Sequence, residues 1–391
     1  MPPKKFDEIP FRINVIKNIL KKTSLKPMFK FNDTTTENFL STKKKEKDDI
    51  ITLLNKKTIN IKEIANELQF TLLYIKSGAI GHTFKGIMKN GSAYGIKVVA
   101  YSKKEKYGDI HEPKRPENVE LLMIKALSYF IITKKTAHIT LPIATFDTSI
   151  IPFTKLDEKD VKNIKSNKKY YDFIKKYKAG EYYDTVSVLI SEWSNRGDFL
   201  DFTKKNYMKY ELTHWKVFFF QILSTLAVIQ SKYPAWRHND LKANNILISK
   251  VQRSRRRKYQ ICGKFYILPD IGYRLRLWDF DFSCIPNKIE NNKVLAKWTK
   301  SINVSNEQNQ YYDMHYFFNT LIREGFVPQI KTSKDIPKEV YEFICRVVPL
   351  KYQKSQYVHE RGRILINDEF MTPKEVIEND DFFAEFRVDK L

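Results

Sequence analysis

Short apolar runs broken by glycine follow one another through the first half of the chain, and each has the length of a β-strand. These runs are Phe70–Ile75, Thr83–Met88, Tyr94–Ala100, His138–Phe146 and Thr185–Ile190. One stretch among them, Glu117–Phe130, instead has its apolar residues at helical spacing. The pattern predicts an antiparallel sheet accompanied by one main helix.

After Asp198 the apolar residues recur mainly with the period of a helix. Helices are predicted at Trp215–Gln230, Tyr312–Ile322, Lys338–Val348 and Pro373–Asn379. The uncharged stretch Val217–Ser231 is too short to span a bilayer, which favours a buried helix. A strand-rich first part and a helix-rich second part predict an α+β protein with two lobes and a cleft between them.

Two lysine-rich segments interrupt this plan. Residues 1–68 are polar and basic, with one short amphipathic helix predicted at Ile59–Leu68. Lys155–Lys178 is dense in lysine without a clean period, so we expect a surface insertion at about 151–184. The predicted organisation is therefore a basic extension over 1–68, a small lobe over 69–193 and a large lobe over 194–391.

The charge balance bears on partners. Lysine and arginine outnumber aspartate and glutamate by 69 to 45, a net charge of +24, which attracts an acidic protein or an anionic membrane. The run Arg253–Lys258 could bind nucleic acid, but a solvated loop between two strands is the favoured interpretation. No apolar run follows the N-terminus and the three cysteines have no paired spacing, so we expect a soluble protein of a reducing compartment without a zinc cluster.

The strongest chemical signal is the segment Arg237–Asn245, which reads RHNDLKANN and precedes an apolar run. A hydroxyl nucleophile needs a carboxylate to orient it and accept its proton, and Asp240 fits that role. Lys242 can reach the charge that builds on a transferring phosphoryl group, and Asn245 offers a neutral oxygen to a magnesium ion. The segment resembles the catalytic loop of protein kinases, with the lysine that serine/threonine kinases place there.

A second segment, Leu277–Phe282, reads LWDFDF and resembles the D-F-G motif of the same superfamily. The resemblance assigns Asp279 to Mg²⁺, which Mn²⁺ can replace. Asp281 stands where the motif has glycine, and aspartate allows less backbone freedom. The departure therefore argues against the usual flipping of this segment.

A third segment, Lys76–Lys85, resembles the glycine-rich loop that covers the phosphates of ATP, with Gly78, Ala79, Ile80 and Gly81 as the contacts. Lys97 follows on the next predicted strand, where kinases place the lysine that pairs with the α- and β-phosphates. An ammonium reaching into a cleft needs a carboxylate to fix it. Glu120 fits the family's helix pattern and Glu117, one turn away, is the alternative.

The segment Leu189–Ser194 resembles the hinge between the lobes, and the resemblance directs the backbone of Glu192, Trp193 and Ser194 to adenine and Asp198 to ribose. The segment beginning at Tyr312 resembles the buried helix whose aspartate, here Asp313, braces the catalytic loop. The resemblance runs from about residue 70 to 385.

Within the superfamily, the chain resembles the poxvirus-type virion-assembly kinases of large cytoplasmic DNA viruses. The shared features are D-F-D, the long segment from Asn245 to Asp279 and a Trp/Tyr-rich approach to Asp313. The resemblance implies the bilobal kinase fold, transfer of the ATP γ-phosphate to protein serine or threonine, and action in the host cytoplasm or the virion. A pseudokinase scaffold is the main alternative, because Lys76, Asn239 and Asp281 depart from the motifs. A small-molecule phosphotransferase is another, which Lys242 disfavours.

Overall fold

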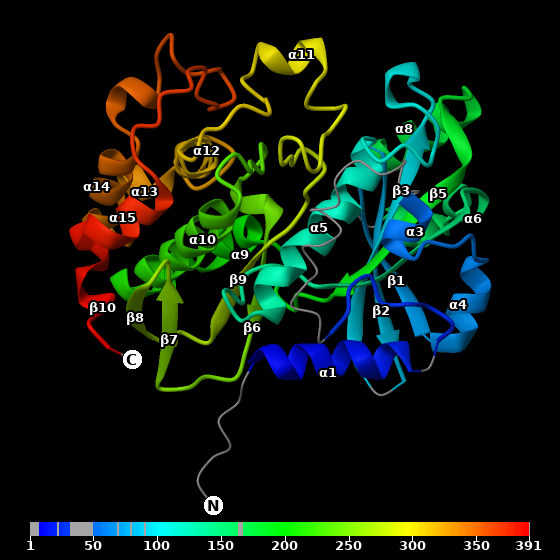
Figure 1. The fold of residues 1–391 in the computed structure, drawn as a ribbon, viewed down its shortest axis with the longest axis horizontal. Coiled ribbons are helices and arrows are strands. Elements are labelled where there is room, and N and C mark those ends of the chain that lie inside the picture. Colours follow the sequence, from blue (N-terminus) through cyan, green and yellow to red (C-terminus); the bar gives the residue numbers. More distant parts are fainter. Residues whose placement is uncertain are drawn as a thin grey trace, which may run out of the picture. The chain divides into compact units, whose positions relative to one another are not determined.

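The computed structural model of the chain describes residues 8–21, 23–31, 50–68, 70–78, 80–89, 91–162 and 167–390. The chain forms two compact units, each with its own core. Unit 1 contains the described residues up to Ile132 together with Leu141–Trp193, and unit 2 contains Thr133–Thr140 and the described residues from Ser194 onward. The class is α+β, as the sequence predicts, with the five-stranded sheet in unit 1 and the longest described helix, Leu212–Lys232, in unit 2 (Figure 1).

The described elements of unit 1 are five strands and a larger number of helices. They are α1 (Glu8–Leu20), α3 (Ile50–Leu54), α4 (Ile61–Leu68), β1 (Phe70–Ser77), β2 (Gly81–Met88), β3 (Ala93–Ser102), η1 (Glu105–Tyr107), α5 (Pro116–Ile132), β4 (Pro142–Ser149), α6 (Ile151–Thr154), α7 (Glu158–Lys162), α8 (Asn167–Lys178) and β5 (Tyr182–Glu192). The predicted strands and main helix are confirmed, although the last part of the expected strand His138–Phe146 alone belongs to β4.

The five strands described in unit 1 form one antiparallel sheet in the order β1-β2-β3-β5-β4. In its register Lys97 of β3 lies between Thr83 of β2 and Leu189 of β5. Gly81 is required by the close approach of β2 to β3, because a Cβ there would lie 1.8 Å from the Val98 carbonyl oxygen. Helix α5 packs beside β4, and nearly all of its side chains are buried.

The lysine-rich segment before β5, expected as a surface insertion, folds into helices. It contains α7 and α8, and α8 contacts β1, β2 and β5. Tyr170 and Phe173, three residues apart on α8, are buried, and the Phe173 ring lies 4.4 Å from the ring of His82. Lys168 and Lys169 are exposed. With many exposed lysines and two buried aromatic residues among the described ones, α8 shows no clear apolar period in the sequence.

Helix α1 belongs to unit 1 and is fixed to the end of β5. Arg12 donates from Nε and Nη2 to the two carboxylate oxygens of Glu192, at 2.8 and 2.7 Å. Both side chains are largely buried, and Glu192 also accepts from the Leu141 N–H at 2.8 Å. Burial alone would lower the pKa of Arg12, but the facing carboxylate raises it, so the guanidinium stays charged.

The elements of unit 2 are mainly helices with short strands between them. They are α9 (Phe199–Asn206), η2 (Tyr207–Lys209), α10 (Leu212–Lys232), η3 (Ala243–Asn245), β6 (Ile246–Lys250), β7 (Arg256–Ile261), β8 (Lys264–Pro269), β9 (Tyr273–Leu277), α11 (Lys297–Lys300), α12 (Tyr312–Leu321), α13 (Gln329–Thr332), α14 (Lys338–Val347), η4 (Leu350–Tyr352), α15 (Pro373–Asn379), η5 (Asp381–Phe386) and β10 (Arg387–Val388). The four helices predicted from the apolar period are confirmed within two or three residues.

Helix α10 is the core of unit 2. Among the described helices it alone is long and apolar enough to cross a membrane, but 78% of its most apolar window is buried inside the protein. Phe219 of α10 packs with Phe343 of α14 and Phe382 of η5, whose own rings stack at 4.3 Å. Burial on several sides is what a core helix requires.

The arginine run was expected to form a solvated loop, and that is only partly right. Strand β7 begins at Arg256 and pairs with β8. Arg257 bonds Asp270 at 2.8 Å, and Arg274 bonds the same carboxylate at 3.1 Å. Burial would raise the pKa of Asp270, but the hydrogen bonds of Arg274 and nearby N–H groups lower it below its usual range. Part of the run therefore serves the structure of unit 2.

Replacing Arg12 by Met should destabilise unit 1 by about 3 kcal/mol or more, because Glu192 keeps a buried charge without its partner. The measurement is the midpoint of thermal or urea unfolding. The double variant Arg12→Met/Glu192→Gln should recover part of the loss, since the buried charge is then gone. Equal stability of the single variant and the unchanged chain would contradict this role of α1.

Candidate active site

The buried carboxylate of Asp313, in unit 2, binds the backbone of the Arg237–Asn245 loop. Asp313, in the first turn of α12, accepts the His238 N–H at 2.7 Å and the Asn239 N–H at 2.9 Å. Burial raises the pKa of Asp313, and the two N–H groups partly offset that effect. Asn239 has φ of 63°, a left-handed conformation that asparagine tolerates, so the loop turns sharply where Asp313 grips it.

The Asp240 carboxylate lies directly after this turn and is held by three side chains. Lys242 Nζ lies 3.0 Å from its Oδ2, and Asn245 Nδ2 donates to the same oxygen at 2.9 Å and to the Asp240 carbonyl at 2.9 Å. Arg363 donates to the other oxygen, Oδ1. The structure thus brings together the three loop residues that the sequence singled out.

Arg363 is a member of this cluster that sequence reasoning missed. It lies 123 residues beyond Asp240, in the segment between η4 and α15, and is buried. Its guanidinium also donates to the Asn239 carbonyl and to the Tyr312 hydroxyl, and it lies 4.1 Å from the centre of the Tyr316 ring. Arg363 therefore joins the loop to α12.

The neutral residue Asn239 has an explicit structural task. Its side-chain Nδ2 donates to the carbonyl oxygens of Phe282 and Ser305, at 3.2 and 2.9 Å. The buried Arg237 adds bonds to the Ser305 hydroxyl at 2.8 Å and the Asn303 carbonyl at 2.6 Å. The loop thus holds the following segment through neutral acceptors, which are backbone carbonyls and the Ser305 hydroxyl.

Asp279 follows β9 and has φ of 67°, again left-handed. Its neighbour Trp278 is tied to the loop, because the Trp278 N–H donates to the Asn245 carbonyl at 3.1 Å. Asp281 lies outside the left-handed region, so aspartate in the glycine position of the motif causes no strain there. Its carboxylate pairs with Lys293, whose ammonium lies 3.5 Å from the centre of the Phe282 ring.

In unit 1, Lys97 of β3 and Glu120 of α5 form an ion pair with Nζ and Oε1 2.6 Å apart. The Lys97 side chain keeps 20% exposure, whereas Glu120 is buried, so the carboxylate holds an ammonium that still reaches solvent. Glu117 points elsewhere: it pairs with Arg115 at 3.3 Å and accepts the Ser102 N–H at 3.4 Å. Of the two alternatives, the structure pairs Glu120 with Lys97.

The hairpin between β1 and β2 carries Gly78, Ile80 and Gly81, while Ala79 lies outside the described residues. The Gly78 N–H donates to the Gly81 carbonyl at 2.7 Å, and the Ile80 carbonyl accepts from Ala100 at 2.8 Å. The Gly78 N–H is therefore already engaged within the turn.

The remaining candidates end unit 1 and begin unit 2. The Glu192 carboxylate accepts hydrogen bonds from Arg12 and from the Leu141 N–H. The Lys85 ammonium lies 5.3 Å from the centre of the Trp193 ring. Ser194 is buried. Asp198 is the N-cap of α9 and accepts the Asp201 N–H at 2.9 Å, a structural function that needs no ligand.

Residues 9–385 match the family model described as the poxvirus serine/threonine protein kinase. The chain belongs to this family. A protein of Acanthamoeba polyphaga mimivirus, provisionally named a serine/threonine-protein kinase, is 43% identical over 386 residues, covering 96% of this chain and 80% of that protein. Serine/threonine-protein kinase 2 of fowlpox virus is 29% identical over 171 residues, covering 42% of this chain and 34% of its own length. The titin kinase with its flanking domains has a TM-score of 0.42 at 10% identity, over 91% of this chain and 53% of that chain, and informs neither fold nor site.

The poxvirus kinase match begins at residue 9, so it includes α1 and Arg12, which the sequence analysis placed in a separate basic extension. Neither Arg12 nor Arg363 has a local signal. Each is one of many basic residues in the sequence, and its role depends on a partner far along the chain. That partner is 180 residues away for Arg12 and 123 residues away for Arg363.

Glu120→Gln should lower phosphoryl transfer by about tenfold or more, because the ion pair that fixes Lys97 becomes a weaker bond to a neutral amide. Glu117→Gln should act mainly on the melting temperature, because Glu117 supports Arg115 and the end of β3. Initial rates and melting temperatures of both variants provide the check. A larger loss of transfer for Glu117→Gln would show that the pairing of α5 with β3 is wrong.

Proposed function

We propose that this poxvirus-family chain is an active kinase that transfers the γ-phosphate of ATP to serine or threonine of proteins, with Mg²⁺ as the metal. The observation that supports this best is the Asp240 carboxylate, fixed by Lys242, Asn245 and Arg363 on a loop gripped by Asp313. Family membership supports the reaction class. Such a fixed carboxylate suits a reaction that depends on positioning and electrostatics.

Asp240 has capacity for a substrate hydroxyl. A carboxylate offers about four lone-pair sites, and the donors on Asp240 use two on Oδ2 and one on Oδ1. A site on Oδ1 remains to accept the proton of a serine or threonine hydroxyl. Because the other sites are taken, the carboxylate keeps one orientation while it aligns that hydroxyl.

Lys242 links this carboxylate to the charge of the transferred group. Its ammonium lies 3.0 Å from Asp240, and its side chain keeps 26% exposure. From that position it can offset negative charge on a phosphoryl oxygen next to the acceptor. On unit 1, Lys97, held by Glu120, is the proposed contact for the α- and β-phosphates.

The residues proposed for the metal fit a magnesium ion. Asn245 spends its Nδ2 on Asp240, so its amide oxygen is the group that it can offer to a cation. Asp279 supplies a carboxylate, and Mg²⁺ prefers oxygen ligands, few of them from protein, with the rest from phosphates and water. When bound, the metal neutralises charge on the phosphates. Mn²⁺ accepts the same oxygen ligands.

The nucleotide contacts stay proposals: Gly78, Ala79, Ile80 and Gly81 at the hairpin, the backbone of Glu192, Trp193 and Ser194 for adenine, and Asp198 for ribose. The relatives are viral proteins, and the resemblance to the poxvirus-type kinases is the basis for proposing action in the host cytoplasm or the virion, in virion assembly. The net charge of +24 supports an acidic protein or an anionic membrane as a partner.

Asp240→Asn should lower phosphate transfer from ATP to a serine-containing protein by about a hundredfold to ten-thousandfold, since the acceptor of the hydroxyl proton is lost. The measurement is the initial rate with labelled ATP, and Asp172→Asn, an exposed change on α8, is the matched control. Near-normal transfer by Asp240→Asn would refute the mechanism. ATP binding by the unchanged chain without any transfer would instead favour the scaffold alternative.

Arg363 should act as a positioning residue. Arg363→Met should reduce kcat by about tenfold or more with a smaller effect on the KM for ATP, because Asp240 loses the donor on Oδ1. Arg363→Lys should restore part of kcat by returning the charge. A melting temperature lowered equally in both variants, with equal kcat, would assign Arg363 a structural role alone.

A further inference from the structure

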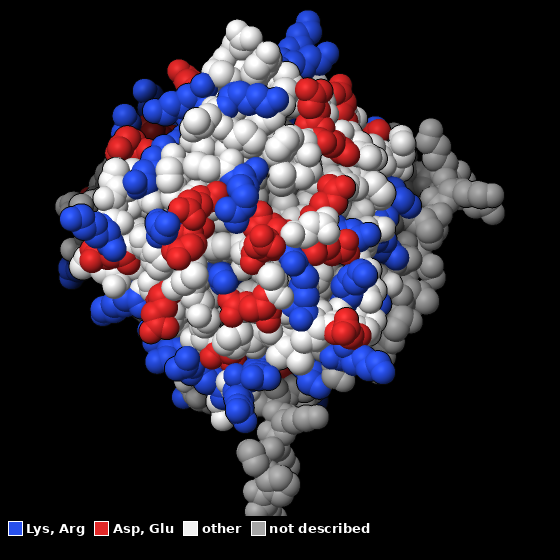
Figure 2. Space-filling view, turned by 90° about the vertical axis from the view of Figure 1, so that its left-hand side faces the viewer, with Lys and Arg blue, Asp and Glu red and all other residues white. Residues whose placement is uncertain are grey.

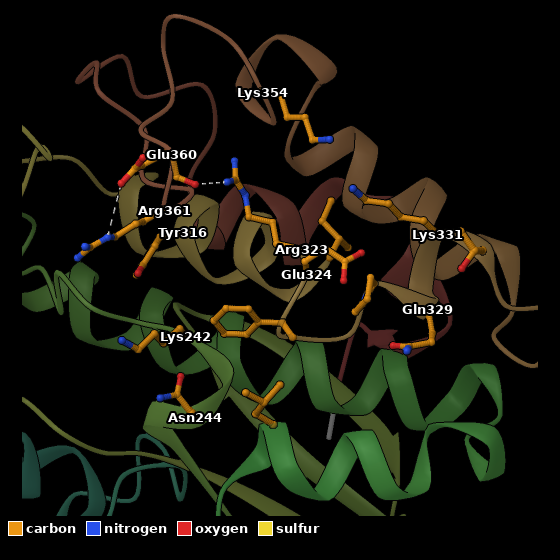
Figure 3. Close-up of a pocket in the computed structure, with 15 residues that line it drawn as sticks. Lys242, Asn244, Tyr316, Arg323, Glu324, Gln329, Lys331, Lys354, Glu360 and Arg361 are labelled. Atoms are coloured by element: carbon orange, nitrogen blue, oxygen red, sulfur yellow. Dashed lines mark hydrogen bonds and ion pairs between the residues drawn. The ribbon is translucent and has the colours of Figure 1, made fainter. Parts of the chain in front are cut away.

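Unit 2 carries a pocket of about 1050 Å³ beside the catalytic loop. Lys242 and Asn244 line one side of it, and residues that follow α12, form α13 and lie between η4 and Arg361 line the other (Figure 3). Lys242 is the residue whose ammonium contacts the Asp240 carboxylate. A residue that lines the pocket therefore contacts Asp240, the proposed acceptor of the proton of the substrate hydroxyl.

The lining is strongly basic. Its cations outnumber its acids by five to two, the cations being Lys242, Arg323, Lys331, Lys354 and Arg361, and the acids Glu324 and Glu360. The acids neutralise little of this charge. Glu360 lies 4.0 Å from Arg361 with both side chains 79% exposed, a contact of small energetic value.

Three of the cations crowd together. The tips of Lys331 and Lys354 point toward the same space in Figure 3. Arg323 donates to the backbone carbonyls of Glu360 and Gln353, at 2.6 and 2.7 Å, so neutral groups hold it in place and leave its charge. Burial lowers the pKa of Lys331, and the neighbouring Lys354 and Arg323 lower it further. Like charges held this close favour an anion between them.

A strongly basic lining is not found everywhere on the surface (Figure 2). The chain has a net charge of +24, yet acidic and basic side chains intermingle on the face that carries α14 and α15 (Figure 2). The pocket also presents apolar surface from Leu200 and Phe326, as a peptide-binding groove does. Size, charge and nearness to Asp240 together fit an extended acidic segment of a protein.

We propose that this pocket binds acidic residues flanking the serine or threonine that is phosphorylated, so that the protein substrates of this chain are acidic. The proposal rests on the proposed kinase function and names its substrate class. Carboxylates and phosphates share the required chemistry, so a segment already phosphorylated would bind as well. The pocket selects by charge pairing, which weakens as salt screens it.

The test uses the full chain with Mg²⁺-ATP and serine peptides that differ only in the flanking residues, which are glutamate, phosphoserine, glutamine or lysine. The expected kcat/KM for the glutamate or phosphoserine peptides exceeds that for the glutamine peptide by about tenfold or more, and that for the lysine peptide by more. The ratio of the glutamate to the phosphoserine result distinguishes the two sources of charge.

The decisive variant is Lys331→Glu/Lys354→Glu, which reverses the crowded charges. The expected result is loss of the preference for acidic peptides and a gain for the lysine peptide. Lys168→Glu/Lys169→Glu on α8 changes the net charge equally and should keep the preference, since both residues are exposed on unit 1. Binding of fluorescent acidic peptides with alanine at the acceptor, followed by anisotropy, gives a readout independent of turnover.

Several outcomes would overturn the inference. Equal kcat/KM for acidic and neutral peptides would refute it while leaving the kinase function standing, whereas no transfer to any peptide would count against the kinase function itself. An equal effect of both charge reversals would show that net charge, and not this pocket, sets the preference. Binding of phosphatidylserine vesicles that is lost in Lys331→Glu/Lys354→Glu, with unchanged peptide selectivity, would replace the acidic substrate by a membrane surface.

Discussion

The buried Asp313 carboxylate is the constraint on which the chemistry of unit 2 depends. It accepts two successive backbone N–H groups, from His238 and Asn239, and so fixes the turn that places the next residue, Asp240. A carboxylate without water would be costly inside the protein unless such donors satisfied it. The donors are backbone groups, which cannot move without unfolding the loop. The position of Asp240 is therefore tied to the core helix packing of α12, and not only to its own side-chain contacts.

Fixed charge recurs in the two units with different consequences. Lys97 with Glu120 and Arg12 with Glu192 are partly or wholly buried pairs, and each joins a helix to a strand of the same sheet. Such pairs fix the position of the helix on the sheet more narrowly than apolar packing does. Burying the two charges costs desolvation energy, which good pairing geometry offsets. In the pocket beside Lys242 the lining cations outnumber the lining acids by five to two. Paired charge thus sets the internal geometry, while unmatched charge is left for a ligand.

Two of the three departures from the kinase motifs, Asn239 and Asp281, are explained by contacts within unit 2. Asn239 binds the carbonyls of Phe282 and Ser305, and Asp281 pairs with Lys293, so both non-standard residues anchor the segment that follows Asp279. An arginine before the catalytic aspartate can hold such a segment through an added phosphate, whereas an amide holds it through neutral carbonyls that are always present. These residues are consistent with a segment ordered without modification.

The sequence by itself determined the class, the main strands and helices in their order, and the presence of Asp240, Lys242 and Asn245 on one loop. These depend on the spacing of apolar residues, on turn residues and on short fixed distances in the sequence, such as those between Asp240, Lys242 and Asn245. All of these patterns lie within a few residues of one another. Only the tertiary structure decided which distant charges meet. Arg363 reaches Asp240 across 123 residues and Arg12 reaches Glu192 across 180, and one basic residue among 69 carries no sign of its partner. The same reason hid α8, whose two buried aromatics pack against residues far from them in the sequence, such as His82. It also hid the basic pocket, whose cations come from separate segments that only folding brings to one place.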